Sequence, residues 1–255
     1  MAHCFSFDGI SATNYGCHLL DSFSMPLLSP IDARDITIEG KHGAYALQSY
    51  YKPLQIELPC VVLGSSRSDL LNKLQSLKML FDVIKGEKQL IFDDLSDRYY
   101  LAKTISVPSA DLLGLSQALI SISLACAIPF ACAVAESSQD ESMPANGIIK
   151  TFPVVAEGTV FAVPVWTMTA DQDAGSVIVR LKNITTNEEI QWTGTISNGD
   201  VLEIDSGHWV VKLNGTGSMA TVSGLFPHLQ ANTSNNIEVK AFHGNLNIKY
   251  RNRYL

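Results

Sequence analysis

Apolar and polar residues alternate through much of this chain, and a period of two residues is typical of β-strands that bury one face. The alternation is clearest at residues 118–126, where isoleucine and leucine at 120, 122 and 124 alternate with serine and alanine. The uncharged stretch 112–135 is long enough to cross a bilayer. Its alternation and Pro129, which cannot donate to a strand ladder, predict a strand instead, so we expect no membrane insertion.

Residues 66–85 have the period of a helix. Their apolar residues are spaced four, three, four and three apart along one face: Leu70, Leu74, Leu77, Phe81 and Ile84. Ser66 can cap the first turn, and Gly86 follows the last turn, where a left-handed residue is favoured. With strands at 36–39, 54–63, 89–92 and 98–107, the first half is predicted to be an α+β unit with one helix on a mostly antiparallel sheet.

A polar and aromatic segment at residues 40–53 separates two of these strands and predicts a protruding hairpin arm. An arm of this length can wrap a neighbouring subunit. Tyr45, Tyr50 and Tyr51 suit a subunit interface, because aromatic residues are enriched at such interfaces. A loop that packs on its own domain explains the segment equally well.

The second half is predicted to be a β-sandwich. Residues 136–147 are polar and end in Pro-Ala-Asn-Gly, which predicts a linker or exposed loop, and we place the boundary between domains 1–137 and 138–255 there. Short strands then recur without a helical period, at 160–168, 175–184, 189–192, 200–205, 208–213, 219–223 and 237–241. A tight two-residue hairpin turn is expected between Asp205 and His208. The last strand can pair in either domain.

Charge and cysteine content narrow the functional classes. The formal net charge is −7, with 16 Asp and Glu against 10 Lys and Arg up to residue 145. This balance disfavours nucleic-acid binding, because counterion release needs clustered cations. The five cysteines lack the spacing of a disulfide framework or a zinc site, so we expect free thiols and no metal: Cys4, Cys17, Cys60, Cys126 and Cys132. The first residues lack the basic and apolar segments of a classical signal peptide.

Two motifs resemble catalytic or cofactor signatures. Residues 214–220 match a dinucleotide-binding glycine pattern, but the residues that follow do not favour the required helix, so we expect no cofactor. Asp205, Ser206 and His208 are the residue types of a hydrolase triad. As neighbours on a hairpin tip they cannot converge on one scissile bond, so we expect no catalytic residues.

Three tryptophans keep a second function open. Trp166, Trp192 and Trp209 all fall in the sandwich half. Such tryptophans more often fill the space between sheets, but exposed ones can stack on sugar rings. The alternative function is therefore a carbohydrate-binding adhesin or lectin-like module. A hydrolase of the cell wall has the least support.

Several segments in the same order along nearly the whole chain resemble the distal tail protein family of long-tailed bacteriophages. They are residues 7–16 (FDGISATNYG), 40–43 (GKHG), 89–102 (QLIFDDLSDRYYLA), 128–130 (IPF), 199–205 (GDVLEID), 224–229 (GLFPHL) and 248–255 (IKYRNRYL). Residues 231–237 depart from the family pattern, which has a proline-glycine turn before the asparagine.

The resemblance implies a structural virion protein of the tail tip, assembled in the host cytoplasm, and no enzyme. It implies a homohexameric ring, single or stacked as a double ring, that joins the major tail tube protein to the tail-associated fibre or lysin protein around a channel for DNA. N-terminal domains with their arms would close the ring. The C-terminal sandwiches, expected to be galectin-like or similar to carbohydrate-binding modules, would point outward and carry receptor-binding proteins. A subunit of the tail tube itself is the alternative within the phage setting.

Overall fold

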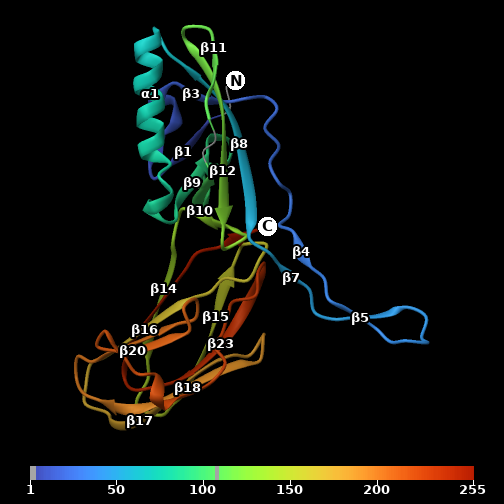
Figure 1. Ribbon diagram of the computed structural model, residues 1–255. Helices are drawn as coiled ribbons and strands as arrows, with labels where there is room; N and C mark the ends of the chain where they lie inside the picture. Colours follow the sequence, from blue (N-terminus) through green and yellow to red (C-terminus); the bar gives the residue numbers. More distant parts are fainter. Residues whose placement is uncertain (1–3, 107–108) are drawn as a thin grey trace. The chain divides into compact units, whose positions relative to one another are not determined.

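The computed structural model describes residues 4–106 and 109–255, which form mainly β-structure with a single α-helix (Figure 1). The chain divides into two compact units: a first unit up to Val134 that also includes Leu255, and a second unit from Ala135 to Tyr254. The predicted fold class is confirmed, since an antiparallel α+β unit precedes a unit of two packed antiparallel sheets. No helix in the described ranges is long and apolar enough to span a membrane.

One antiparallel sheet with the order β2-β1-β9-β10-β12-β8-β3 forms the first unit, with β11 beside β12 and β13 beside β10. Its longest ladder pairs β8 with β12, from Leu54 opposite Cys126 to Leu63 opposite Gln117. Every second residue of both strands is buried, as the alternation predicts. The strands are β1 (Phe5–Phe7), β2 (Ile10–Ser11), β3 (Cys17–Leu19), β8 (Leu54–Leu63), β9 (Lys88–Phe92), β10 (Arg98–Ser106), β11 (Asp111–Leu113), β12 (Gln117–Cys126) and β13 (Ala131–Ala133). Residue 107, the last of one predicted strand, lies outside the described residues.

Helix α1 (Arg67–Leu80) begins where the sequence predicts. The Ser66 hydroxyl accepts a hydrogen bond from the Asp69 backbone N–H at 3.2 Å, which satisfies one of the free donors of the first turn. After the last turn, the Phe81 ring stacks on Phe7 of β1 with centroids 4.9 Å apart. This contact fixes the end of the helix against the sheet.

The predicted end of the helix is wrong by five residues. Asp82 takes an extended conformation, and its carboxylate accepts a hydrogen bond from the Ile84 N–H at 3.0 Å, which starts the separate 3-10 turn η2 (Val83–Lys85). Ile84 is therefore 88% exposed rather than part of the buried helix face. Gly86 follows this turn instead of capping α1.

Between β3 and β8 the chain forms the arm, which is longer than predicted. An inner ladder pairs β4 (Ile31–Asp32) with β7 (Tyr50–Tyr51), and an outer ladder pairs β5 (Asp35–Thr37) with β6 (Ala44–Ala46). The strand expected at 36–39 thus belongs to the arm and not to the sheet. Its apolar residues alternate like those of a sheet strand, which explains the error.

The second unit is a sandwich of two sheets, ordered β14-β24-β16-β19-β20-β21 and β15-β23-β17-β18-β22. One buried cluster takes side chains from both sheets, among them Trp166 and Leu246 from the first and Trp192 and Val239 from the second. The strands are β14 (Ser137–Met143), β15 (Ile149–Ala156), β16 (Val165–Ala170), β17 (Gly175–Asn183), β18 (Glu188–Ile196), β19 (Val201–Asp205), β20 (Val210–Leu213), β21 (Thr216–Gly217), β22 (Val222–Gly224), β23 (Thr233–Lys240) and β24 (Gly244–Tyr250). The short strand β25 (Arg253–Tyr254) follows them in the chain and belongs to neither of these two sheets.

The segment predicted as a linker, 136–147, contains the edge strand β14, so that prediction is wrong. Its composition is misleading because polar side chains occupy both faces of the strand. Glu141 forms an ion pair with Lys150 at 2.7 Å, and the backbone pairs with β24 along its whole length. The sequence prediction also missed β15.

Two local predictions in the second unit need correction. The turn between β19 and β20 has four residues, 206–209, because the Asp205 carboxylate accepts hydrogen bonds from Gly207 N and His208 N at 2.8 and 3.0 Å and closes a wider turn. The strand expected at 219–223 begins as the 3-10 turn η4 (Met219–Thr221), so the glycine pattern at 214–220 is followed by no α-helix.

Candidate assembly surfaces

The arm extends away from the β8–β12 sheet of the first unit (Figure 1). Its two ladders place Ile31 opposite Tyr51 and Ile36 opposite Tyr45. A two-stranded ribbon with no covered apolar face is at best marginally stable in water. The arm therefore gains most in stability from a surface that covers it.

The three predicted interface tyrosines lie on the arm but do not form one patch. Tyr45 is in the outer ladder, and the Lys41 ammonium lies 3.6 Å from its ring centroid. Tyr50 is exposed in the inner ladder and donates its hydroxyl to Gln48 Oε1 at 3.2 Å. The neighbouring Tyr51 instead contacts the body of the first unit. Their role in an interface remains a prediction.

Tyr51 anchors the base of the arm. Its ring meets Phe130 edge-on, with centroids 5.6 Å apart and an interplanar angle of 82°. Such edge-to-face pairs contribute about 0.5–1.5 kcal/mol beyond the area they bury. The ring of Tyr51 is thus partly covered by its own chain, whereas the rings of Tyr45 and Tyr50 are exposed and could pack against a partner.

Large aliphatic side chains on the arm and just before it form a second set of exposed residues, which the sequence prediction missed. They are Leu27, Leu28, Ile31, Ile36, Ile38 and Leu47. The available signal was the apolar composition of residues 27–31, which the prediction assigned to no element, while Ile36 and Ile38 fall in a segment that it assigned to the sheet. Exposed apolar residues that gather in one segment of the chain make that segment a candidate interaction surface.

A groove on the first unit lies beside helix α1 and the β11–β12 hairpin. It encloses about 750 Å³, and its apolar lining includes Leu71, Leu74, Phe81, Val83 and Leu112. Leu71, Val83 and Leu112 are substantially exposed. The helix therefore buries one face on its own sheet and leaves a second apolar face open.

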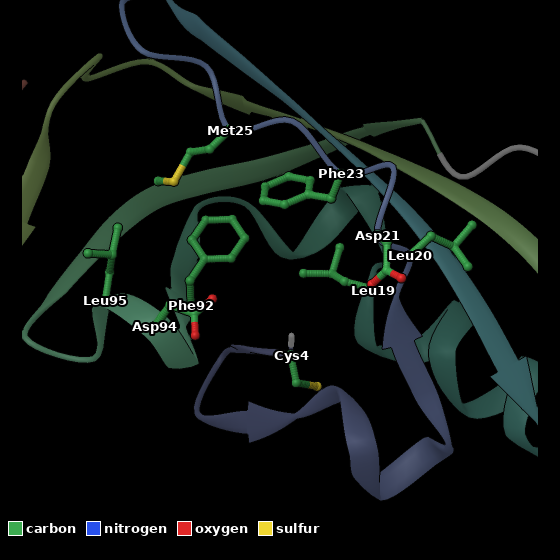
Figure 2. A pocket seen from close by; sticks show the side chains of 9 residues that line it. All are labelled: Cys4, Leu19, Leu20, Asp21, Phe23, Met25, Phe92, Asp94 and Leu95. Carbon is green, nitrogen blue, oxygen red and sulfur yellow. The ribbon is translucent and has the colours of Figure 1, made fainter. Parts of the chain in front are cut away.

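A smaller pocket of about 410 Å³ opens beside β9 and β3 in the first unit. Figure 2 shows Phe23 and Phe92 next to one another in its wall, and their rings stack with centroids 5.3 Å apart. Cys4 lines it from the segment before β1, and Asp21 and Asp94 also contribute. Burial raises the pKa of the Cys4 thiol, so this thiol stays protonated near neutral pH and is a poor nucleophile.

The other cysteines are free thiols and buried as well. Hydrogen bonding to the Cys17 thiol, together with burial, raises the pKa of Cys60. Burial and the nearby charge of Glu87 raise the pKa of Cys126 to about 12. Within residues 4–106 and 109–255, no group of three or more His, Cys, Asp or Glu side chains is placed to hold a metal ion.

The triad-like residues on the β19–β20 turn, Asp205, Ser206 and His208, form hydrogen bonds that hold the turn and its connection to the core. Burial raises the pKa of the Asp205 carboxyl, but hydrogen bonds from the His208 ring and from backbone N–H groups outweigh this and hold the pKa below its ordinary value. The Ser206 hydroxyl accepts the indole N–H of Trp166 at 3.2 Å in the sandwich interior. Asp205 thus braces a loop, and Ser206 points into the core.

The tryptophans divide between core and surface. Trp166 and Trp192 are buried, and the Trp192 indole N–H donates to Ser218 Oγ at 2.9 Å. Both fill the space between the sheets and satisfy their polar atom, as core tryptophans do. Trp209 is 71% exposed.

Comparison with known families covers both units. The family described as phage tail protein RIFT-related domain matches residues 10–126, and the C-terminal domain of the siphovirus-type tail component matches residues 157–254. Together these matches extend over most of the chain. No curated protein sequence matches it significantly.

Solved structures share the fold over the full length. The crystal structure of the phage SPP1 Dit protein, described as a paradigm of the hub adsorption apparatus in phages that infect Gram-positive hosts, aligns with a TM-score of 0.75 at 15% identity and covers 100% of both chains. The phage P2 baseplate in its calcium-activated conformation aligns with a TM-score of 0.56 at 9% identity, over 99% of this chain and 98% of that one. The strontium form of that baseplate gives 0.55 at 10% identity, over 98% of each chain. Both halves of the sequence therefore match siphovirus tail families in the expected order, and the chain belongs to the siphophage distal tail protein family.

Proposed function

We propose that this protein is the structural hub at the distal end of a long non-contractile phage tail and that it has no catalytic role. Six copies form a ring, single or stacked as a double ring, around a channel for DNA. The ring joins the major tail tube protein to the tail-associated fibre or lysin protein and carries receptor-binding proteins. It assembles in the host cytoplasm and becomes part of the virion tail tip.

The observation that carries this proposal is the arm. It holds aliphatic and aromatic residues, including Ile36 and Tyr45, on a ribbon that its own chain leaves exposed. An exposed two-stranded extension of this kind is stabilised by pairing or packing against another chain. The full-length structural likeness to a protein described as a hub supports the same conclusion.

The groove beside α1 provides a matching acceptor on the same unit. In a closed cyclic ring each subunit uses two different faces, and one face of a subunit packs against the other face of its neighbour. The arm supplies an apolar ribbon, and the groove of about 750 Å³ supplies an apolar recess. We infer that the arm of one copy packs on the first unit of the next, with Tyr45 and Tyr50 in the interface.

The charge distribution fits a channel that passes DNA without holding it. Acidic residues outnumber basic ones by 16 to 10 up to residue 145, within a chain of net charge −7. Like charge prevents the phosphate neutralisation that supplies most non-specific affinity for DNA. We therefore expect no specific binding of nucleic acid by the ring.

The test is the solution mass of the full chain, measured by light scattering over a concentration series. The test variant replaces Ile36 and Tyr45, which lie opposite one another in the outer ladder, with serine. The control replaces Ile178 with serine in β17 of the second unit, since Ile178 is 55% exposed and Ile36 is 50% exposed. Circular dichroism checks that all variants are folded.

We expect a discrete species of six or twelve chains for the unaltered protein and for Ile178→Ser, and smaller species for the double variant. A chain that stays monomeric at every concentration would overturn self-assembly into a ring. Long filaments would contradict the hub and favour a tail tube subunit. A double variant that still forms the ring would refute the role assigned to the arm.

A further inference from the structure

Trp209 combines two unfavourable features at the tip of the β19–β20 turn. Its backbone has a φ of 56°, a left-handed conformation in which bulky residues are true outliers and Gly or Asn is favoured. Its side chain is 71% exposed, although the other two tryptophans of the unit are buried. Outliers of this kind persist where the surroundings fix them, and they cluster at functional sites.

The turn holds Trp209 in this conformation through Asp205. One carboxylate oxygen accepts hydrogen bonds from Gly207 N and His208 N, and the other lies 2.7 Å from His208 Nδ1. Ser206, the first residue of the turn, is tied to the core through Trp166. The indole is thus presented to solvent from a rigid base, and little conformational freedom would be lost when a ligand contacts it.

A hollow of about 600 Å³ lies next to this indole, wholly within the second unit. Phe161, Met219, Leu225 and Phe226 supply its apolar lining. Of these, Leu225 is 66% exposed, and Phe161 and Met219 are also exposed. The volume falls within the range of pockets that bind small molecules.

The polar lining of the hollow includes a carboxylate paired with an imidazole. Glu188 Oε2 lies 2.6 Å from His228 Nδ1 and also accepts the His228 backbone N–H at 2.9 Å and the Thr186 hydroxyl at 3.1 Å. The His228 ring in turn meets Phe161 edge-on at 5.2 Å. Among the described residues, the hydrogen bonds of Glu188 use Oε2, so Oε1 is left to accept a hydroxyl from a ligand.

We propose that this hollow binds a neutral saccharide, with the apolar face of one sugar ring stacked on Trp209 and a ring hydroxyl donated to Glu188. A pyranose has one face of C–H groups and a rim of hydroxyls, which matches an indole beside a fixed carboxylate. The negative charge of Glu188 disfavours a phosphate or other anionic ligand. The inference does not depend on the hub proposal, because the hollow belongs to one chain.

The size of the surface favours a saccharide over a protein partner. A standard protein interface involves about 20–30 residues on each side. The exposed apolar residues at this hollow are only a handful, and they surround a concave space rather than a broad patch. A recess of this kind suits one or two sugar rings.

The decisive variant is Trp209→Asn, because asparagine accepts the left-handed conformation and removes only the indole. Trp209→Phe keeps an aromatic face as an intermediate case. The purified full chain is tested on an array of immobilised neutral saccharides, including glucose, galactose, rhamnose and N-acetylglucosamine, and each hit is titrated by calorimetry, whose signal does not depend on the tryptophan that the variants replace. The midpoint of chemical unfolding is measured for every variant.

We expect binding to at least one neutral saccharide, reduced at least about tenfold by Trp209→Asn and less by Trp209→Phe. The stability of Trp209→Asn should equal or exceed that of the unaltered chain, because the backbone strain is relieved. Absence of binding across the array would overturn the proposal. So would binding that Trp209→Asn leaves unchanged, or a Trp209-dependent interaction with a tail protein in place of a sugar.

Discussion

Asn235 gives the sharpest test of how the second unit is held together. Its side chain is fully buried, accepts hydrogen bonds from Asn183 Nδ2 at 3.0 Å and Gln230 N at 2.8 Å, and donates to the carbonyls of Gln230 and Thr233 at 3.0 and 3.3 Å. This one amide therefore fixes the loop before β23.

We expect Asn235→Ala to lower the free energy of unfolding by about 2–4 kcal/mol. Each buried polar group that loses its partner costs about 1–3 kcal/mol. Asn183 would lose one partner but keep its hydrogen bond to the His228 carbonyl, and the exposed Gln230 would recover some bonding to water. The removed side-chain atoms also leave a cavity. The total is a large fraction of the stability of an ordinary domain.

The measurement is guanidinium unfolding followed by tryptophan fluorescence. All three tryptophans of the chain lie in the second unit, so the signal reports that unit alone. Asn236→Ala is the matched control, because Asn236 is the exposed neighbour on the same strand. The control should stay within about 0.5 kcal/mol of the unaltered chain. If Asn235→Ala stays equally close, the buried amide does not hold the loop and the reasoning fails.

Three further predictions concern separate parts of the chain. Gly16→Ala should destabilise the first unit by about 2 kcal/mol or more, seen as a lower thermal midpoint, because φ is 63° and the new Cβ would lie 2.4 Å from the Leu63 carbonyl oxygen. Glu141→Gln should cost up to about 1 kcal/mol at pH 7. The hydrogen bond from Lys150 lowers the pKa of Glu141 below its ordinary 4.5, so this stabilisation is present above that pH and is lost as the pH falls through the folded-state pKa; denaturation at pH 7 and pH 3 should show the difference shrinking. Finally, a thiol reagent at pH 8 should label fewer than one cysteine per native chain and all five after denaturation; rapid native labelling of Cys126 would contradict its burial.

Sequence reasoning succeeded where burial is one-sided and local signals agree. The alternation at residues 54–63 and 118–126 identified the central ladder, because a strand with one buried face must alternate. The first residue of α1 was predictable because Ser66 caps its own helix through a contact three residues away. Local chemistry of this kind does not depend on the rest of the fold.

The failures have a common cause in contacts distant along the chain. Strand β14 has a loop-like composition, and only its pairing with β24, about a hundred residues later, makes it a strand. The arm begins earlier than expected. The alternation of apolar residues around Ile36 looks the same in a strand of the arm as in a strand of the sheet, so the sequence could not tell the two apart. The sequence also could not separate Trp209 from Trp166 and Trp192, since Trp166 and Trp192 become buried only when the two sheets pack on one another.

The arm and the hollow beside Trp209 need covering surfaces of different size, so the two proposals can be tested separately. The arm is an extended ribbon whose exposed residues, such as Ile36 and Tyr45, need a long covering surface, and only another chain or a large part of one supplies it. Trp209 lies on a turn that its own unit already holds rigid, so a small ligand is enough to cover it. Serine at Ile36 and Tyr45 should therefore change the mass of the assembly and leave saccharide binding intact, while Trp209→Asn should do the reverse. If either variant changed both properties, the two surfaces would belong to one function, and at least one proposal would be wrong.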